Sequence, residues 1–245
     1  MLWGNTRLII CGMLVFLATG ATVQAGWTDW LQKLEGVAPT GSGTATGVAG
    51  LSETEIIAGL KEALSVGIER ATSLLGQEGG FLDDATVRIP IPESLRQVER
   101  ALRSVGQEAL ADDLLMSMNR AAEKATPATT SILVDTVKGM SLDDARSILS
   151  GPDDAATQYF RRTNETRLGD TILSIIQDAT AQTGVTATYK KMTGSLGFLS
   201  QFTDPDSLDL DRYVTQKTLD GLFLKLAQEE ELIRRDPLAR STELL

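Results

Sequence analysis

The sequence predicts an all-α protein, a single compact multi-helix domain of about eight to ten helices. Apolar residues recur at spacings of three and four through most of residues 52–235, and this spacing is the period of an amphipathic helix. Sustained alternation of apolar and polar residues, the pattern of a half-buried strand, is almost absent. Because no repeat of about 20 to 50 residues is convincing, we expect one domain rather than a solenoid.

The first 25 residues are typical of an export signal. A positive charge at Arg7 precedes an apolar stretch, and Val23-Gln24-Ala25 forms a small-residue cleavage site. The apolar stretch is about a dozen residues long, shorter than the roughly 20 that are needed to span a bilayer. We therefore expect a cleaved signal peptide at 1–25, a periplasmic protein that begins near Gly26, and no transmembrane segment after cleavage.

The residue types that are missing exclude several chemistries. Histidine is absent, and Cys11, the one cysteine, lies inside the predicted signal, so we expect a cysteine-free mature chain. This excludes Ser-His-Asp and Cys-His catalysis and zinc sites built from Cys and His. Phosphate-binding and dinucleotide-binding glycine motifs are also absent. The acidic stretch at 204–211 departs from the calcium-loop pattern, with Asp209 where glycine is needed. We expect no metal and no cofactor.

The chain is acidic, which limits its partners. It has 33 acidic and 23 basic residues, a net charge of −10; without Arg7, 22 basic residues remain and the net charge is −11. We expect no nucleic acid partner, because phosphate contacts need clustered Lys and Arg. An unknown small ligand or an envelope protein is the partner that we expect.

A flexible Gly/Thr-rich linker precedes the first predicted helix. We expect residues 26–50 to be a flexible N-terminal segment, because their second half is uncharged and rich in small residues. Ser52 and Glu55 then form a capping box, in which each side chain accepts the backbone amide of the other residue. The helical period runs from there to a closing glycine at 76. This helix opens an all-helical domain at 51–240, and 241–245 is a C-terminal tail.

Prolines separate the next elements. Residues 87–92, Val-Arg-Ile-Pro-Ile-Pro, cannot be helix interior, because proline lacks an amide hydrogen and disfavours helical geometry in the residue before it. Pro92 suits the first turn of a helix over about 92–106. Further helices are predicted over 107–125 and 127–139.

The remaining part of the domain predicts four more helices. Ser141 caps a short helix, and Gly151-Pro152-Asp153-Asp154 begins another. A longer helix is expected over 168–184 and the last over about 209–235. In the last helix, Gly221 predicts a close contact with another helix. Its charged end, with glutamate and arginine four apart at 230/234 and 231/235, predicts ion pairs on a solvated face.

Four residues that follow Gly151 form one candidate binding group, namely Gln158, Tyr159, Arg161 and Arg162. Two adjacent arginines after an aromatic pair can bind a carboxylate or a phosphate, because guanidinium groups are bidentate donors. The alternative is that these arginines bond the last carbonyls of their own helix and nearby acids.

A second candidate group is Asn119, Arg120 and Glu123. Alanines beside them predict tight packing against another helix, so the polar side chains form either a buried network or ligand contacts. Tyr213 and Lys217 of the last helix complete the set of candidate residues for a ligand or a partner.

Several separated motifs resemble a known family. They are IPIPESL, MNRAAE, MSLDDARSILSG, DDAATQYFRR, and YVTQKTLDGLF with the later EEELIRRDP. Over about residues 51–240 the chain resembles the bacterial family known as domain of unknown function 4197 (DUF4197). The resemblance implies an exported, helical, single-domain protein of gram-negative type bacteria. It implies no catalytic or binding residue, because the family has no assigned function.

Our leading hypothesis is a non-enzymatic periplasmic helical module that binds a ligand or a protein partner in a groove between helices. The candidate residues above support it, since they gather on helices rich in small residues. Two alternatives stay open. One is a carboxylate-dependent hydrolase that acts on cell-envelope glycan, because paired Asp and Glu residues can cleave a sugar bond. The other is a purely structural envelope protein.

Overall fold

The computed structural model describes residues 52–183 and 209–235, and this part of the chain is helical, without strands. Its α-helices are α2 (Glu53–Gly76), α3 (Arg96–Ser104), α4 (Glu108–Ala125), α5 (Thr129–Gly139), α6 (Leu142–Leu149), α7 (Ala155–Thr183) and α9 (Leu210–Arg235). Two 3-10 helices are η1 (Glu93–Leu95) and η2 (Thr126–Ala128). The all-α prediction is confirmed for these residues, but their seven α-helices are fewer than predicted. The predicted signal peptide, linker and tail lie outside the described residues.

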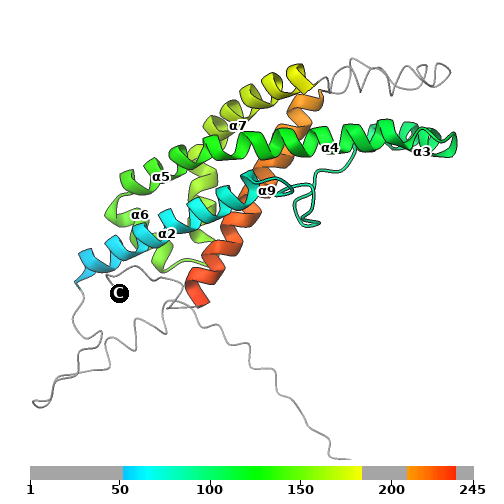
Figure 1. The fold of residues 1–245 in the computed structure, drawn as a ribbon. Helices are drawn as coiled ribbons and strands as arrows, with labels where there is room; N and C mark the ends of the chain where they lie inside the picture. Colours follow the sequence, from blue (N-terminus) through cyan, green and yellow to red (C-terminus); the bar gives the residue numbers. More distant parts are fainter. Residues whose placement is uncertain (1–51, 184–208, 236–245) are drawn as a thin grey trace, which may run out of the picture.

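Helices α7 and α9 form the centre of the fold. They run side by side; α2 packs against α9, and α4 packs against both (Figure 1). Helices α4 and α5 follow one another through η2 along one side of α2. Helix α3 folds back beside α4, and this pair extends from the rest of the molecule as an arm (Figure 1). None of the described helices combines the length and the apolar character needed to cross a membrane.

Three phenylalanines from different elements fill the core. Phe160 of α7, Phe223 of α9 and Phe81, which follows α2, are each at most 2% exposed. Burying a large apolar side chain stabilises a fold by roughly 1.5–3 kcal/mol. The core therefore depends on the segment after α2 as well as on the helices.

Helix α2 begins and ends where the sequence predicts. Ser52 Oγ accepts the Glu55 amide at 3.3 Å, and Glu55 Oε2 accepts the Ser52 amide at 2.6 Å, so the capping box is confirmed. Halfway along α2, a Cβ on Gly67 would lie 3.2 Å from Ile233 Cδ1 and 3.5 Å from Glu229 Cβ of α9. Glycine at this position therefore lets α2 and α9 approach closely.

The two helices predicted on either side of residue 168 are one continuous helix, α7, so the predicted division is wrong. A buried residue recurs at every fourth position along α7. These residues are Ala156, Phe160, Asn164, Leu168, Ile172 and Ile176. The face that they form packs against α4 and α9, and this packing outweighs the low helix propensity of Gly169.

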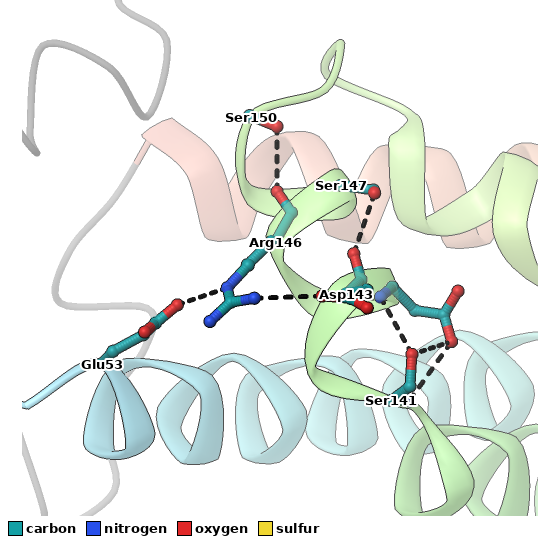
Figure 2. A network of polar contacts seen from close by, with 7 residues as sticks. Glu53, Ser141, Asp143, Arg146, Ser147 and Ser150 are labelled. Atoms are coloured by element: carbon teal, nitrogen blue, oxygen red, sulfur yellow. Dashed lines mark hydrogen bonds and ion pairs between the residues drawn. The ribbon is translucent and has the colours of Figure 1, made fainter.

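Helix α6 is the short helix predicted after Ser141, and Figure 2 shows how it is attached to the start of α2. Ser141 and Asp144 form a second capping box. Arg146 pairs with Glu53 of α2 and, at 3.0 Å, with Asp143. Since Arg146 and both of its acidic partners are more than half exposed, this attachment contributes little stability.

Candidate functional site

The longest described segment without a helix joins α2 to η1. We call residues 77–92 the strap; they contain turns but no helix. Segments of this length without secondary structure are uncommon in compact domains and often serve a function. The strap is also where four of the nine candidate residues meet.

Glu123 of α4 binds the first part of the strap. It is 4% exposed, and its Oε1 accepts hydrogen bonds from the amides of Phe81 at 3.1 Å and Leu82 at 3.2 Å. Its Oε2 pairs with Arg120 at 2.8 Å, and Arg120 also pairs with Glu78 of the strap at 2.6 Å. Glu123 thus satisfies backbone amides for which an irregular segment has no helix or sheet partner.

Asn119 and Tyr213 bind the second part of the strap. Asn119 is fully buried; its Oδ1 accepts the amide of Ile89 and its Nδ2 donates to the carbonyl of the same residue, both at 2.9 Å. The Nδ2 group also donates to the Leu115 carbonyl at 2.8 Å. The Tyr213 hydroxyl donates to the Pro90 carbonyl at 3.0 Å. Burial raises the pKa of Tyr213, which keeps this phenol protonated and able to donate.

An ion pair attaches the middle of the strap to α9. Asp84 Oδ2 lies 2.6 Å from Lys225 Nζ. Asp84 Oδ1 accepts the Thr86 hydroxyl at 2.6 Å and the Thr86 amide at 2.9 Å. The hydrogen bonds from Lys225 and Thr86 lower the pKa of Asp84 from 3.8 to about 2. The carboxylate is therefore ionised and fixed in place at neutral pH.

The strap lies directly on α9 at Gly221. A Cβ at this position would lie 2.8 Å from Phe81 Cε1 and 3.3 Å from Val87 Cβ. A close contact is present as predicted, but the expectation that another helix makes it is wrong. The ring of Phe81 occupies the space that a side chain on α9 would need.

The candidates on α7 have other partners. The guanidinium carbon of Arg161 lies 4.3 Å from the centre of the Phe223 ring, and its Nη1 lies 3.4 Å from Glu165. Arg162 is exposed and interacts electrostatically with Asp144. Both arginines therefore have partners within the protein.

The other candidates contact residues close to them in the sequence. Gln158 donates to Asp154 at 2.8 Å. The Tyr159 ring meets the Phe160 ring edge to face, with 5.9 Å between the ring centres. Lys217 lies 3.9 Å from an aspartate of α9. The structure thus brings Asn119, Arg120, Glu123 and Tyr213 together at the strap, and the other five candidates contact different groups.

A second buried carboxylate, Glu230 of α9, holds the start of α7. It is 4% exposed and accepts the amides of Ala156 and Thr157, each at 2.9 Å, together with the Thr157 hydroxyl at 2.9 Å. Arg234 pairs with Glu230 at 2.8 Å and donates to the Ile148 carbonyl at 3.1 Å. A carboxylate at a helix N-terminus satisfies amides that lack partners and interacts favourably with the helix dipole.

The solvated ion pair expected between Glu230 and Arg234 is therefore a buried one, with side chains only 4% and 5% exposed. A signal for this burial was present in the sequence. Leu226 and Ile233 lie four residues before and three residues after Glu230, so Glu230 falls on the apolar face of α9. The next pair, between Glu231 and Arg235, is exposed as expected.

Glu229, beside Glu230, lines an open depression between α2 and α9. The depression measures about 590 Å³, and Val66, Glu69, Arg70, Leu74 and Gln77 line its other side. We call it the α2–α9 depression. Leu74 is 44% exposed in it.

The carboxyl group of Glu229 has no hydrogen bond or ion pair with another described residue. Burial raises its pKa, and the charges of Arg70 and Lys225 oppose that shift only in part. Glu229 is not among the predicted site residues, because it lies in a run of three glutamates that is typical of the charged end of a helix.

A second open depression of about 460 Å³ lies between α2 and η2 and shares Glu69, Ser73 and Gln77 with the first. The outward face of α2 near its end is therefore open on both flanks. None of the nine candidate residues lines either depression. Within 52–183 and 209–235, no group of three or more Asp, Glu, Cys or His side chains could hold a metal ion.

Among known proteins, the chain matches one family model. A family model described as "Protein of unknown function (DUF4197)" matches residues 50–245. No curated protein and no solved structure matches the chain. The matched residues include the strap and the α2–α9 depression.

Proposed function

Since the chain belongs to the DUF4197 family, whose function is unknown, we propose a function from its geometry: it is a non-enzymatic helical module that binds a protein partner. The binding site is the α2–α9 depression. The partner presents a segment with one apolar and one basic side chain.

The observation that carries the proposal is the unpaired carboxyl group of Glu229. A partly buried carboxylate without a partner is unfavourable, and a cation from a binding partner offsets that cost. The carboxyl groups of the neighbouring glutamates are paired: Glu230 and Glu231 each form an ion pair with an arginine four residues later.

Leu74 provides the apolar part of the site. It is 44% exposed, and covering apolar surface contributes about 25 cal/mol per Å². Glu69, Arg70 and Gln77 surround it as the polar rim that protein interfaces usually have.

The charge of the chain supports a basic partner. Its net charge of −10 attracts cations at long range and accelerates their association. A segment that carries Lys or Arg beside an apolar residue fits both the long-range field and the local contacts.

Export to the periplasm belongs to the same proposal. Its support is the charged, apolar and small-residue pattern of residues 1–25. N-terminal sequencing of the protein purified from its own host should begin near Gly26. A protein that keeps Met1 would contradict export by a cleaved signal.

Photo-crosslinking in the host tests the binding site. A light-activated residue replaces Leu74 in the full chain, and in a control it replaces Leu142, which is 54% exposed on α6. A defined protein adduct should form from position 74 and not from position 142. The crosslinked segment, identified by mass spectrometry, should contain Lys or Arg.

A matched pair of variants then tests the role of the carboxylate. Glu229→Gln should weaken binding of the purified partner segment about tenfold, because a charge-assisted contact is lost. Glu231→Gln is the control and should leave the affinity unchanged. Failure to form an adduct at position 74, or equal affinities for wild type and Glu229→Gln, would overturn the proposal.

A further inference from the structure

Lys225 is the cation of α9 that is best placed to neutralise Glu229, but it pairs with the strap instead. The two residues are four positions apart, a spacing that puts side chains on the same helix face. The Lys225 ammonium group nevertheless lies 2.6 Å from Asp84, and its side chain is 11% exposed. Glu229 is left without an ion pair among the described residues.

Asp84 is held firmly enough to keep this pairing. Both the hydroxyl and the amide of Thr86 donate to its Oδ1, at 2.6 Å and 2.9 Å. On either side of Asp84, the strap is bound by the buried side chains of Glu123 and Asn119. The position of the Asp84 carboxylate is thus set by the body of the domain, whereas the long Lys225 side chain can reorient.

We propose that Asp84 is a positioning residue for the partner site: by binding Lys225, it leaves the carboxylate of Glu229 for an ammonium or guanidinium group of the partner. The inference rests on the proposed function, because it assigns a ligand class to the same depression. When Asp84 loses its charge, Lys225 turns to Glu229 and closes the site with an internal ion pair.

The charges around the depression favour a cation over an anion. Glu69 and Glu229 are its acidic groups, and Arg70 is the basic one. Lys225 does not line the depression, and the charge of Asp84 balances its own. A carboxylate or phosphate ligand would be repelled by two carboxylates and attracted by one guanidinium group. An ammonium or guanidinium ligand would be attracted by the two carboxylates and repelled by the one guanidinium group.

The pairing of Lys225 can be tested without any partner. The pKa of Glu229 is measured by NMR of its carboxyl carbon in the full chain. Asp84→Asn should lower this pKa, because Lys225 then pairs with Glu229. Asp84→Asn combined with Lys225→Met should return it to the wild-type value or above. Thr86→Val, which only loosens Asp84, should lower it by a smaller amount.

The ligand class is tested with n-butylguanidinium and n-butylammonium as probes, with butyrate as the anionic control. Both cations should shift the NMR signals of Glu229 and Leu74, and butyrate should not. Asp84→Asn should weaken cation binding about fivefold, the effect expected for one competing ion pair on the surface. The double variant Asp84→Asn with Lys225→Met should bind at least as well as wild type.

The possible failures are distinguishable. An unchanged pKa of Glu229 in Asp84→Asn, or equal probe affinities in that variant and wild type, would overturn the positioning role and leave the proposed function standing. Absence of a partner adduct at position 74 would overturn the proposed function. Tighter binding of butyrate than of the two cations would overturn the ligand class.

Discussion

Glu123 and Glu230 are two buried carboxylates with nearly the same set of partners and different tasks. Each is 4% exposed, accepts two consecutive backbone amides and pairs with an arginine of its own helix. Glu123 holds the irregular strap, whereas Glu230 holds the first turn of α7. The same arrangement therefore supports either a loop or a helix, according to which amides lack partners nearby.

The two sites differ in how much water reaches the arginine. The side chain of Arg120 is 35% exposed and has a second, exposed partner in Glu78. The side chain of Arg234 is 5% exposed and also donates to the Ile148 carbonyl. An arginine that can turn to water tolerates the loss of its acid, but a buried arginine does not. The environment of the arginine, more than the number of hydrogen bonds, therefore sets the cost of breaking each site.

The largest effect is expected at Glu230. Glu230→Ala should lower the free energy of unfolding by about 3–5 kcal/mol, because it leaves the Arg234 charge buried and unpaired. Urea unfolding followed by circular dichroism measures the loss, and Glu231→Ala on the exposed neighbour is the control. The double variant Glu230→Gln with Arg234→Met should recover part of the stability, since no unpaired charge remains. A loss smaller than that of Glu123→Ala would contradict the argument from exposure.

A smaller effect is expected at Glu123. Glu123→Ala should cost about 1–3 kcal/mol, the range for buried amides that lose their acceptor, because Arg120 can be solvated. Hydrogen exchange should speed up at the amides of Phe81 and Leu82, while the amides at the start of α7 stay protected. Arg120→Ala should cost a similar amount, because the buried Glu123 carboxylate, whose side chain is 5% exposed, then loses its cation. Equal acceleration of exchange in the strap and in α7 would show that the two sites do not act separately.

The smallest effect is expected at Asp84, the more exposed acidic anchor of the strap. Its folded-state pKa of about 2 lies below the ordinary 3.8, so the ion pair with Lys225 stabilises the fold above about pH 4. That contribution is lost as the pH falls through about 2. Because the pair is near the surface, the loss should be about 1 kcal/mol. Urea unfolding at pH 2 to 5 should show a smaller decline for Asp84→Asn than for wild type, and parallel curves would refute this assignment.

Local signals predicted most of the helices. The capping boxes at Ser52 and Ser141 and the apolar period placed α2 and α6 at their observed starts. The same signals predict two helices where the structure has only α7. A start signal at 151–154 and a strong apolar run from 168 do not reveal whether a helix continues between them. That depends on the face packed against α4 and α9, which is a tertiary effect.

The candidate site could be predicted only in part. Asn119 and Glu123 are candidate residues because polar side chains on an alanine-rich helix face need partners. Those partners could not be identified, since the strap has no period and its bonds join residues far apart in the sequence. Glu229 was missed because consecutive residues on a helix point in directions about 100° apart. Three adjacent glutamates therefore occupy three environments that no composition rule distinguishes.

The contact of α2 with α9 at Gly67 joins the first described helix to the last. A chain is synthesised from its N-terminus, so the parts of α2, α4 and α7 that pack against α9 stay uncovered until α9 follows. The contacts with α9 form only after α9 has been synthesised, and they close a long stretch of chain at a considerable cost in entropy. The position of α9 in the core therefore makes its synthesis a condition for complete folding, and a product interrupted before α9 leaves these faces open to proteolysis.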